Sequence, residues 1–122
     1  MKNIILAAAL VLGLATGASF AQRTGPNGGM VAGSADHQVE LVLAPTEISV
    51  YLLDDGKVTT VQGANVRAVV QDAGRTINVA LSASGPNRLA GRLEAPLAKG
   101  ARVVISGRDG HNHSVSARFV VP

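Results

Sequence analysis

From Val39 onward, apolar and polar residues alternate with a period of two, which is typical of β-strands that bury one face. The pattern begins with Val39, Leu41 and Leu43, which alternate with Gln38, Glu40 and Val42. The same alternation predicts strands over 38–43, 47–52, 64–70, 76–83, 87–93, 102–106 and 113–121. No stretch of this region has the 3.6-residue period of a helix.

Turn-forming residues separate these runs. They are Ala44-Pro45-Thr46, Asp54-Asp55-Gly56-Lys57, Asp72-Ala73-Gly74-Arg75, Ser84-Gly85-Pro86-Asn87 and Arg108-Asp109-Gly110. About seven short strands with turns between them predict an all-β, antiparallel β-sandwich with an immunoglobulin-like topology, and a small barrel is the alternative. Residues 94–100 suit a short helical turn or a loop that crosses between sheets.

The first residues read as an export signal. Lys2 precedes an apolar run over 4–14, and small residues follow up to Ala21, where we expect cleavage. The predicted organisation is therefore a signal peptide over 1–21, a glycine-rich segment over 22–36 and a β-sandwich domain over 37–122. No later apolar stretch approaches the roughly 20 residues of a membrane span, so we expect a periplasmic or secreted protein that does not insert into a membrane after cleavage.

Composition narrows the classes of function. The chain has no cysteine, which excludes thiolate ligands and disulfides, and after cleavage its only aromatic residues are Tyr51 and Phe119. Loss of Lys2 lowers the formal charge from +3 to about +2. The arginines considered for a polyanion site are spread over different segments: Arg67, Arg75, Arg88, Arg92 and Arg102. This dispersal favours solvated charges and argues against nucleic acid as a partner.

The stretch "RDGHNHS" (108–114) carries two of the three histidines. A tight turn centred on Asp109-Gly110 would place His111 in or beside the turn and His113 at the start of the last strand. Side chains two apart on a strand share a face, so His111 and His113 can offer two imidazole nitrogens to one copper or zinc ion. The alternative is a solvated hairpin tip with no ligand.

A metal site needs more donors than these two. Asp109 in the tip is one oxygen donor, and His37 and Met30 are more distant candidates, with the Met30 thioether suited to copper(I). Glu40 is a poor partner for His37, because residues three apart on a strand face opposite sides.

Catalytic signatures are absent from the sequence. There is no GxSxG and no Ser-x-x-Lys, and Asp54-Asp55 is more typical of a turn than of a carboxylate pair. "GPNGG" (25–29) lacks the lysine and the following helix of a phosphate loop. We therefore expect a protein that is not an enzyme.

Several short motifs carry a resemblance: "GPNGGMV", "VELVL", "ISVYLLDDGK", "NRLAGRLEAPLAKGARVVIS" and "HSVSARF". They resemble small exported bacterial β-proteins and the module at the N-terminal side of periplasmic adaptor subunits in heavy-metal efflux systems of the resistance-nodulation-division type. The resemblance implies a periplasmic accessory module that binds copper or zinc and works with an efflux or metal-handling protein.

Two positions depart from that family's pattern. Relatives commonly have Gly-Pro-His-Gly-Gly at the start, whereas this chain has Asn27 in place of the histidine, and an amide is a poorer metal ligand than imidazole. Relatives also tend to carry a histidine where this chain has Gln38, with His37 one residue earlier. His111 and His113 would then have to compensate.

Two hypotheses follow. The first is a metal-binding accessory module, with an ion held by His111 and His113 and completed by His37 or Met30. The second is a non-catalytic structural or protein-interaction domain with incidental histidines. A structure separates them, because the first requires His37 to lie near the 111–113 tip and the second does not.

Overall fold

The structure is a computed structural model that describes residues 23–34 and 36–122. The signal peptide expected over 1–21, and its cleavage site, lie outside the described residues. Within the described part, the chain is all-β, and it contains no helix that is long and apolar enough to cross a membrane.

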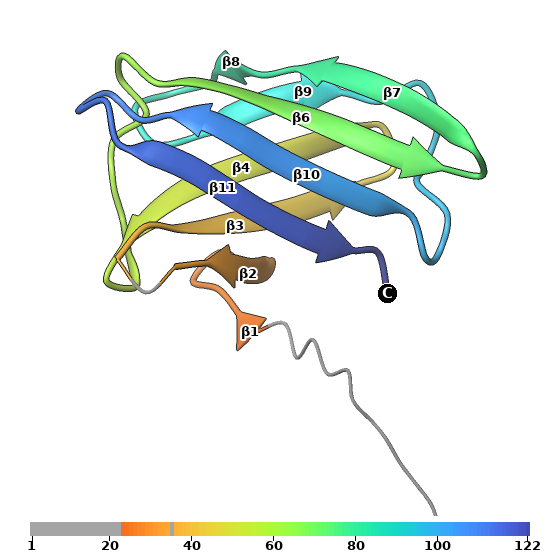
Figure 1. The fold of residues 1–122 in the computed structure, drawn as a ribbon, viewed down its shortest axis with the longest axis horizontal. Coiled ribbons are helices and arrows are strands. Elements are labelled where there is room, and N and C mark those ends of the chain that lie inside the picture. Colours follow the sequence, from red (N-terminus) through yellow and green to blue (C-terminus); the bar gives the residue numbers. More distant parts are fainter. Residues whose placement is uncertain (1–22, 35) are drawn as a thin grey trace, which may run out of the picture.

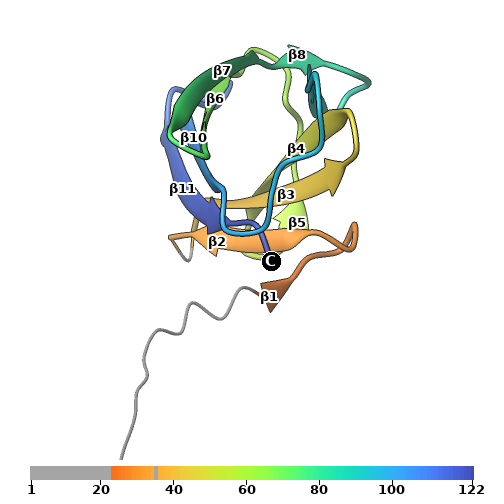
Figure 2. The ribbon, with the colours of Figure 1, turned by 90° about the vertical axis from the view of Figure 1, so that its right-hand side faces the viewer.

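Two antiparallel sheets pack against each other, as the end-on view in Figure 2 shows. The larger sheet contains β1 (Arg23–Thr24), β2 (Met30–Gly33), β3 (Gln38–Ala44), β4 (Glu47–Asp54), β5 (Lys57–Val58), β8 (Ser82–Ala83) and β9 (Leu89–Arg92). The smaller sheet contains β6 (Asn65–Asp72), β7 (Arg75–Ala80), β10 (Arg102–Arg108) and β11 (Ser114–Val120), and it faces the viewer in Figure 1. The predicted all-β sandwich is confirmed.

The strand order is immunoglobulin-like. In the larger sheet β3-β4-β9-β8 follows the A-B-E-D order of that fold, and in the smaller sheet β11-β10-β6 follows G-F-C, with β7 added beside β6. The strands form two separately hydrogen-bonded sheets, so the alternative of a small closed barrel does not describe this chain.

The number of strands differs from the prediction of about seven, since the described residues form eleven. The run over 76–83 divides into β7 and β8, because the chain passes from the smaller to the larger sheet at Leu81. The glycine-rich segment also adds β1 and β2 to the larger sheet, so the sandwich begins before residue 37. Gly29 permits this pairing, because a Cβ there would lie 2.4 Å from the carbonyl oxygen of Leu41.

The core follows the predicted alternation. Val103 and Ile105 of β10 are fully buried, and each lies between inward-facing residues of β6 and β11. Phe119 is the largest buried side chain, and the remaining core residues are valine, leucine, isoleucine and alanine. The β4–β5 connection confirms the predicted turn, because Asp55 and Gly56 both have positive φ (52° and 83°), as a two-residue type I′ turn requires. Residues 94–100 form a loop from β9 to β10 without a helical turn.

Glu40 and Ser49 are the buried polar residues of the described part of the chain, and Glu40 is the one with a charged side chain. It is 0% exposed, and its carboxyl group accepts hydrogen bonds from the backbone N–H of Asn27 (2.8 Å), the side-chain amide of Asn27 (2.9 Å) and the backbone N–H of Gly29 (2.8 Å). The loop over 25–29 therefore folds over Glu40, and Gly25 fits there only because it lacks a Cβ. Glu40 is committed to this loop, in agreement with the expectation that it does not pair with His37.

Replacing Glu40 tests how much this loop depends on one carboxyl group. Glu40→Leu should lower the free energy of unfolding by about 3 kcal/mol, because it leaves N–H donors of the loop without an acceptor. Glu40→Gln should cost only about 1 kcal/mol, since its amide oxygen still accepts and the Asn27 amide can turn to match it. Urea unfolding of residues 22–122 measures both values, and equal losses in the two variants would contradict this role.

Candidate metal centre

The β10–β11 connection is a compact hairpin tip. The backbone N–H of Asn112 donates to the carbonyl of Asp109 (3.0 Å), and that of Asp109 donates to the carbonyl of His113 (3.0 Å). Asn112 has φ = 66°, the left-handed conformation that closes a three-residue hairpin loop. The turn is therefore centred on Gly110-His111, one residue later than predicted, and β11 begins at Ser114, just after His113.

Asp109 shapes this tip. Its Oδ1 accepts hydrogen bonds from the backbone N–H groups of His111 and His113, both at 2.8 Å. The first of these bonds is that of an Asx-turn, in which an aspartate side chain accepts from the backbone two residues later. Its second oxygen, Oδ2, lies 3.3 Å from Nδ1 of His113. One carboxylate thus fixes the backbone around both histidines and still presents an oxygen to the His113 ring.

A neighbouring loop holds the tip in place. A Cβ on Gly110 would lie 2.1 Å from the carbonyl oxygen of Gln62, so the backbones of the tip and of the β5–β6 connection are in direct contact. The β5–β6 connection is itself anchored, because the backbone N–H of Val61 donates to the carbonyl of Pro86 at 2.9 Å. The hairpin therefore rests on the β5–β6 connection at Gly110, while residues 110–113 remain exposed to solvent.

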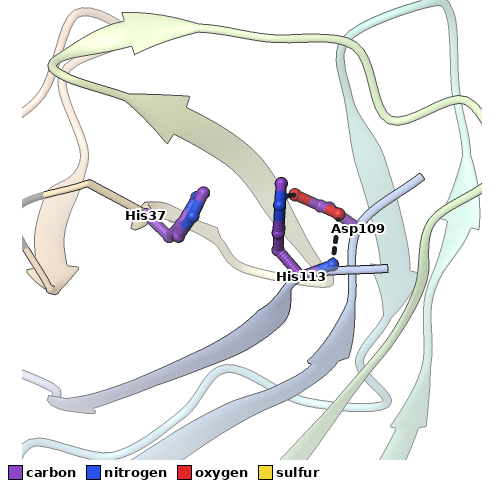
Figure 3. A group of neighbouring side chains, drawn as sticks. All are labelled: His37, Asp109 and His113. Carbon is purple, nitrogen blue, oxygen red and sulfur yellow. Dashed lines mark hydrogen bonds and ion pairs between the residues drawn. The ribbon is translucent and has the colours of Figure 1, made fainter. Parts of the chain in front are cut away.

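His37 reaches the tip from the other sheet. It directly precedes β3, and its backbone N–H donates to Oγ of Ser34 at 3.3 Å. Its ring stacks against that of His113, with centroids 4.8 Å apart and planes 27° from parallel. Figure 3 shows the two imidazoles facing each other, with Asp109 on the far side of His113.

His37, Asp109 and His113 together form a group of three candidate metal donors. One ligand atom from each lies within 4.8 Å of the others. Donors around a tetrahedral zinc ion at about 2.1 Å are about 3.4 Å apart, so binding requires the rings to turn and close by about 1.4 Å. His113 is exposed and the other two are half-buried, which leaves room for that adjustment.

The group borders a small pocket of about 120 Å³. Besides the three donors, its lining includes His111, Leu53, Asp54, Thr59 and Thr60. The sequence analysis assigned Asp54 to a turn and did not consider the threonines. No local sequence pattern indicates that strand ends distant in the sequence lie close together in the fold. Asp54 adds a second carboxylate near the histidines.

Two predicted site residues lie outside the group of three donors. Met30 lies on β2 and packs against the hydrophobic core. It pairs with Leu41, whereas His37 lies beside the Gly33–Gln38 pair, three positions further along the same two strands. His111 lies in the turn, not on a strand, so the shared-face argument does not apply to it. Its ring is 6.2 Å from that of His113, beside the group of three donors rather than within it.

The electrostatics of Asp109 suit a cation. Burial by itself raises the pKa of Asp109, but hydrogen bonds from the backbone N–H groups of His113 and His111, together with the neighbouring His113 ring, hold that pKa below its ordinary value. The carboxylate is therefore ionised at neutral pH and places a negative charge next to two imidazoles.

Comparison with known proteins adds little. No family model matches the chain, and no curated protein matches it. One solved structure is similar: the archaellum periplasmic stator protein FlaG from Sulfolobus acidocaldarius, with 17% sequence identity and a TM-score of 0.38, covering 66% of this chain and 99% of that one. At that TM-score the similarity carries no argument, and the fold rests on the chain's own strand order.

The lowered pKa of Asp109 gives a pH-dependent prediction. Because the folded value lies below that of the unfolded chain, about 3.9, the stabilisation is present above that pH and disappears as the pH falls through the folded value. The stability difference between the native protein and Asp109→Asn should therefore be constant near pH 7 and should shrink as the pH falls below about 3.9 and through the lowered pKa of Asp109. Urea unfolding across this range measures it, with the exposed Glu94→Gln as the control; a difference that grows in acid would contradict the assignment.

Proposed function

We propose that this protein is a non-catalytic β-sandwich module that binds one divalent transition-metal ion at His37, Asp109 and His113. The observation that carries the proposal is the meeting of these three donors, from two different sheets, at one end of the sandwich. The metal-binding hypothesis requires His37 to lie near the hairpin tip. A domain with incidental histidines does not require it.

The donor set indicates the kind of ion. Two imidazole nitrogens and one carboxylate oxygen suit Zn²⁺ or Cu²⁺, with water or His111 in a further position. Met30 packs against the core, which argues against a thioether-rich copper(I) site. Zinc has no redox chemistry, and the hydroxyls of Thr59 and Thr60 beside the site donate to the carbonyls of Leu52 and Pro86, both at 3.2 Å. The role we propose is therefore capture of the ion rather than chemistry on a substrate.

The cellular setting is part of the proposal. The resemblance of "GPNGGMV" and the later motifs to the adaptor-side module supports a role in heavy-metal efflux or homeostasis, in the periplasm or outside the cell. Asn27, which replaces the histidine common in relatives, binds Glu40 through its backbone N–H and side-chain amide. In this chain the N-terminal loop is therefore structural, and the metal donors lie at the hairpin tip.

Native mass spectrometry of residues 22–122 titrated with Zn²⁺, Cu²⁺ and Ni²⁺ tests the proposal. We expect the protein to bind one ion at micromolar concentration. His37→Ala, His113→Ala or Asp109→Asn should each lower the affinity by about 10- to 100-fold, because each change removes one of the three donors. Histidine ring resonances of His37 and His113 should shift together on addition of Zn²⁺.

Two variants serve as controls. His111→Ala should weaken binding less than His37→Ala, and Glu94→Gln should leave it unchanged. Loss of binding in His111→Ala with full binding in His37→Ala would contradict the proposed donor set. Equal, non-stoichiometric uptake by all variants would leave a non-catalytic interaction domain as the better interpretation.

A further inference from the structure

The outer face of the smaller sheet gathers four arginines that are dispersed in the sequence. Arg67 of β6, Arg102 and Arg108 of β10, and Arg118 of β11 are all exposed, whereas the alternate positions on the same strands face the core. Sequence reasoning treated the arginines as scattered solvated charges, because their strands are separated along the chain. The sheet places them side by side on the face toward the viewer in Figure 1.

The strand register arranges these arginines in two diagonal pairs. Val104 pairs with Arg118 while Arg102 pairs with Val120, so Arg102 and Arg118 are diagonal neighbours on β10 and β11. In the same way Ser106 pairs with Arg67 and Arg108 with Asn65. Diagonal neighbours in a sheet are about 7–8 Å apart. The two pairs are centred near the levels of Val103 and Gly107 on β10, so about four residues, or about 13 Å along the strand, separate them.

No carboxylate neutralises this face. The outward positions of the four described strands contain no aspartate or glutamate, and in the described part of the chain Arg67, Arg102 and Arg118 form no ion pair. Arg108 donates only to the carbonyl of Asn112, at 3.0 Å. The nearest acid in sequence, Asp109, uses its oxygens for His111 and His113.

Each arginine pair borders a hollow in the surface. Arg67 and Arg108 line one of about 550 Å³, together with Asn65, Ser106 and Asn112. Arg102 and Arg118 line one of about 780 Å³ at the other end, where Arg23 of β1 adds a fifth guanidinium. Planar guanidinium groups bind phosphate oxygens in a bidentate manner, so the arginine pair at the border of each hollow is suited to a phosphate group.

We propose that this face docks the protein on an anionic phospholipid membrane, with lipid phosphates at the two arginine pairs. Lipids diffuse laterally in a bilayer, so their phosphate groups can match the spacing of the two arginine pairs. A nucleic acid fits less well, because the outward positions of these strands carry no aromatic side chain on which bases could stack. The docking is peripheral and leaves the fold intact.

Vesicle flotation tests this proposal with residues 22–122 and a metal chelator, so that the result is independent of the metal centre. We expect binding to phosphatidylcholine vesicles that contain phosphatidylglycerol, no binding to phosphatidylcholine alone, and loss of binding at high salt. Arg67→Gln/Arg118→Gln should lower the partition coefficient about 25-fold, roughly fivefold for each arginine.

A second double variant matches the loss of charge. Lys57→Gln/Arg92→Gln removes two exposed basic residues of the larger sheet, on β5 and β9, and should retain most of the binding. Thermal unfolding followed by circular dichroism checks that both variants are folded. Equal losses in the two variants, no binding of the native protein to anionic vesicles, or tighter binding to a single-stranded oligonucleotide than to vesicles would each overturn the proposal.

Discussion

Burial of every second side chain along β6, β10 and β11 is the constraint on which the other features depend. Val103 and Ile105 are fully buried between the neighbouring strands, and a shift of one residue in the pairing would turn every apolar side chain of a strand to solvent. The register that satisfies this burial also determines where β10 ends and where its hairpin tip lies. It sets the diagonal spacing of the arginines on the opposite face as well. The candidate metal centre and the arginine-rich face are thus both results of one packing requirement.

Much of the fold could be predicted from local patterns. The alternation in 113–121 and the Asp55-Gly56 turn each depend on neighbouring residues, and both appear in the structure. The division of 76–83 at Leu81 could not be predicted, because the apolar residues on both sides of it continue the same period of two. The pairing of β2 with β3 was missed for a different reason: it depends on the distant carboxyl group of Glu40 and on a glycine at position 29.

The candidate site was predictable only in part. His113, Asp109 and His37 were each visible as donors, but the preference for His111 over Asp109 came from applying the shared face of a strand to His111. The structure centres the turn on Gly110-His111, one residue later than predicted, and the hydrogen bonds of Asp109 hold it there. His37 meets His113 because of the immunoglobulin-like strand order. That order brings the start of β3, beside His37, to the same end of the sandwich as the β10–β11 connection. Asp54, Thr59 and Thr60 reach that end from β4 and from the chain just after β5, and no local pattern reveals it.

The short strand β2 has a consequence for how the protein behaves in a crowded solution. It occupies the hydrogen-bonding edge of β3, a long strand that would otherwise present a row of unpaired N–H and C=O groups to other chains. The hydrogen bonds of Glu40 to Asn27 and Gly29 hold the approach to β2 in place. A chain shortened past Gly33 would thus expose the edge of β3. We expect such a chain to self-associate through this edge rather than simply to unfold.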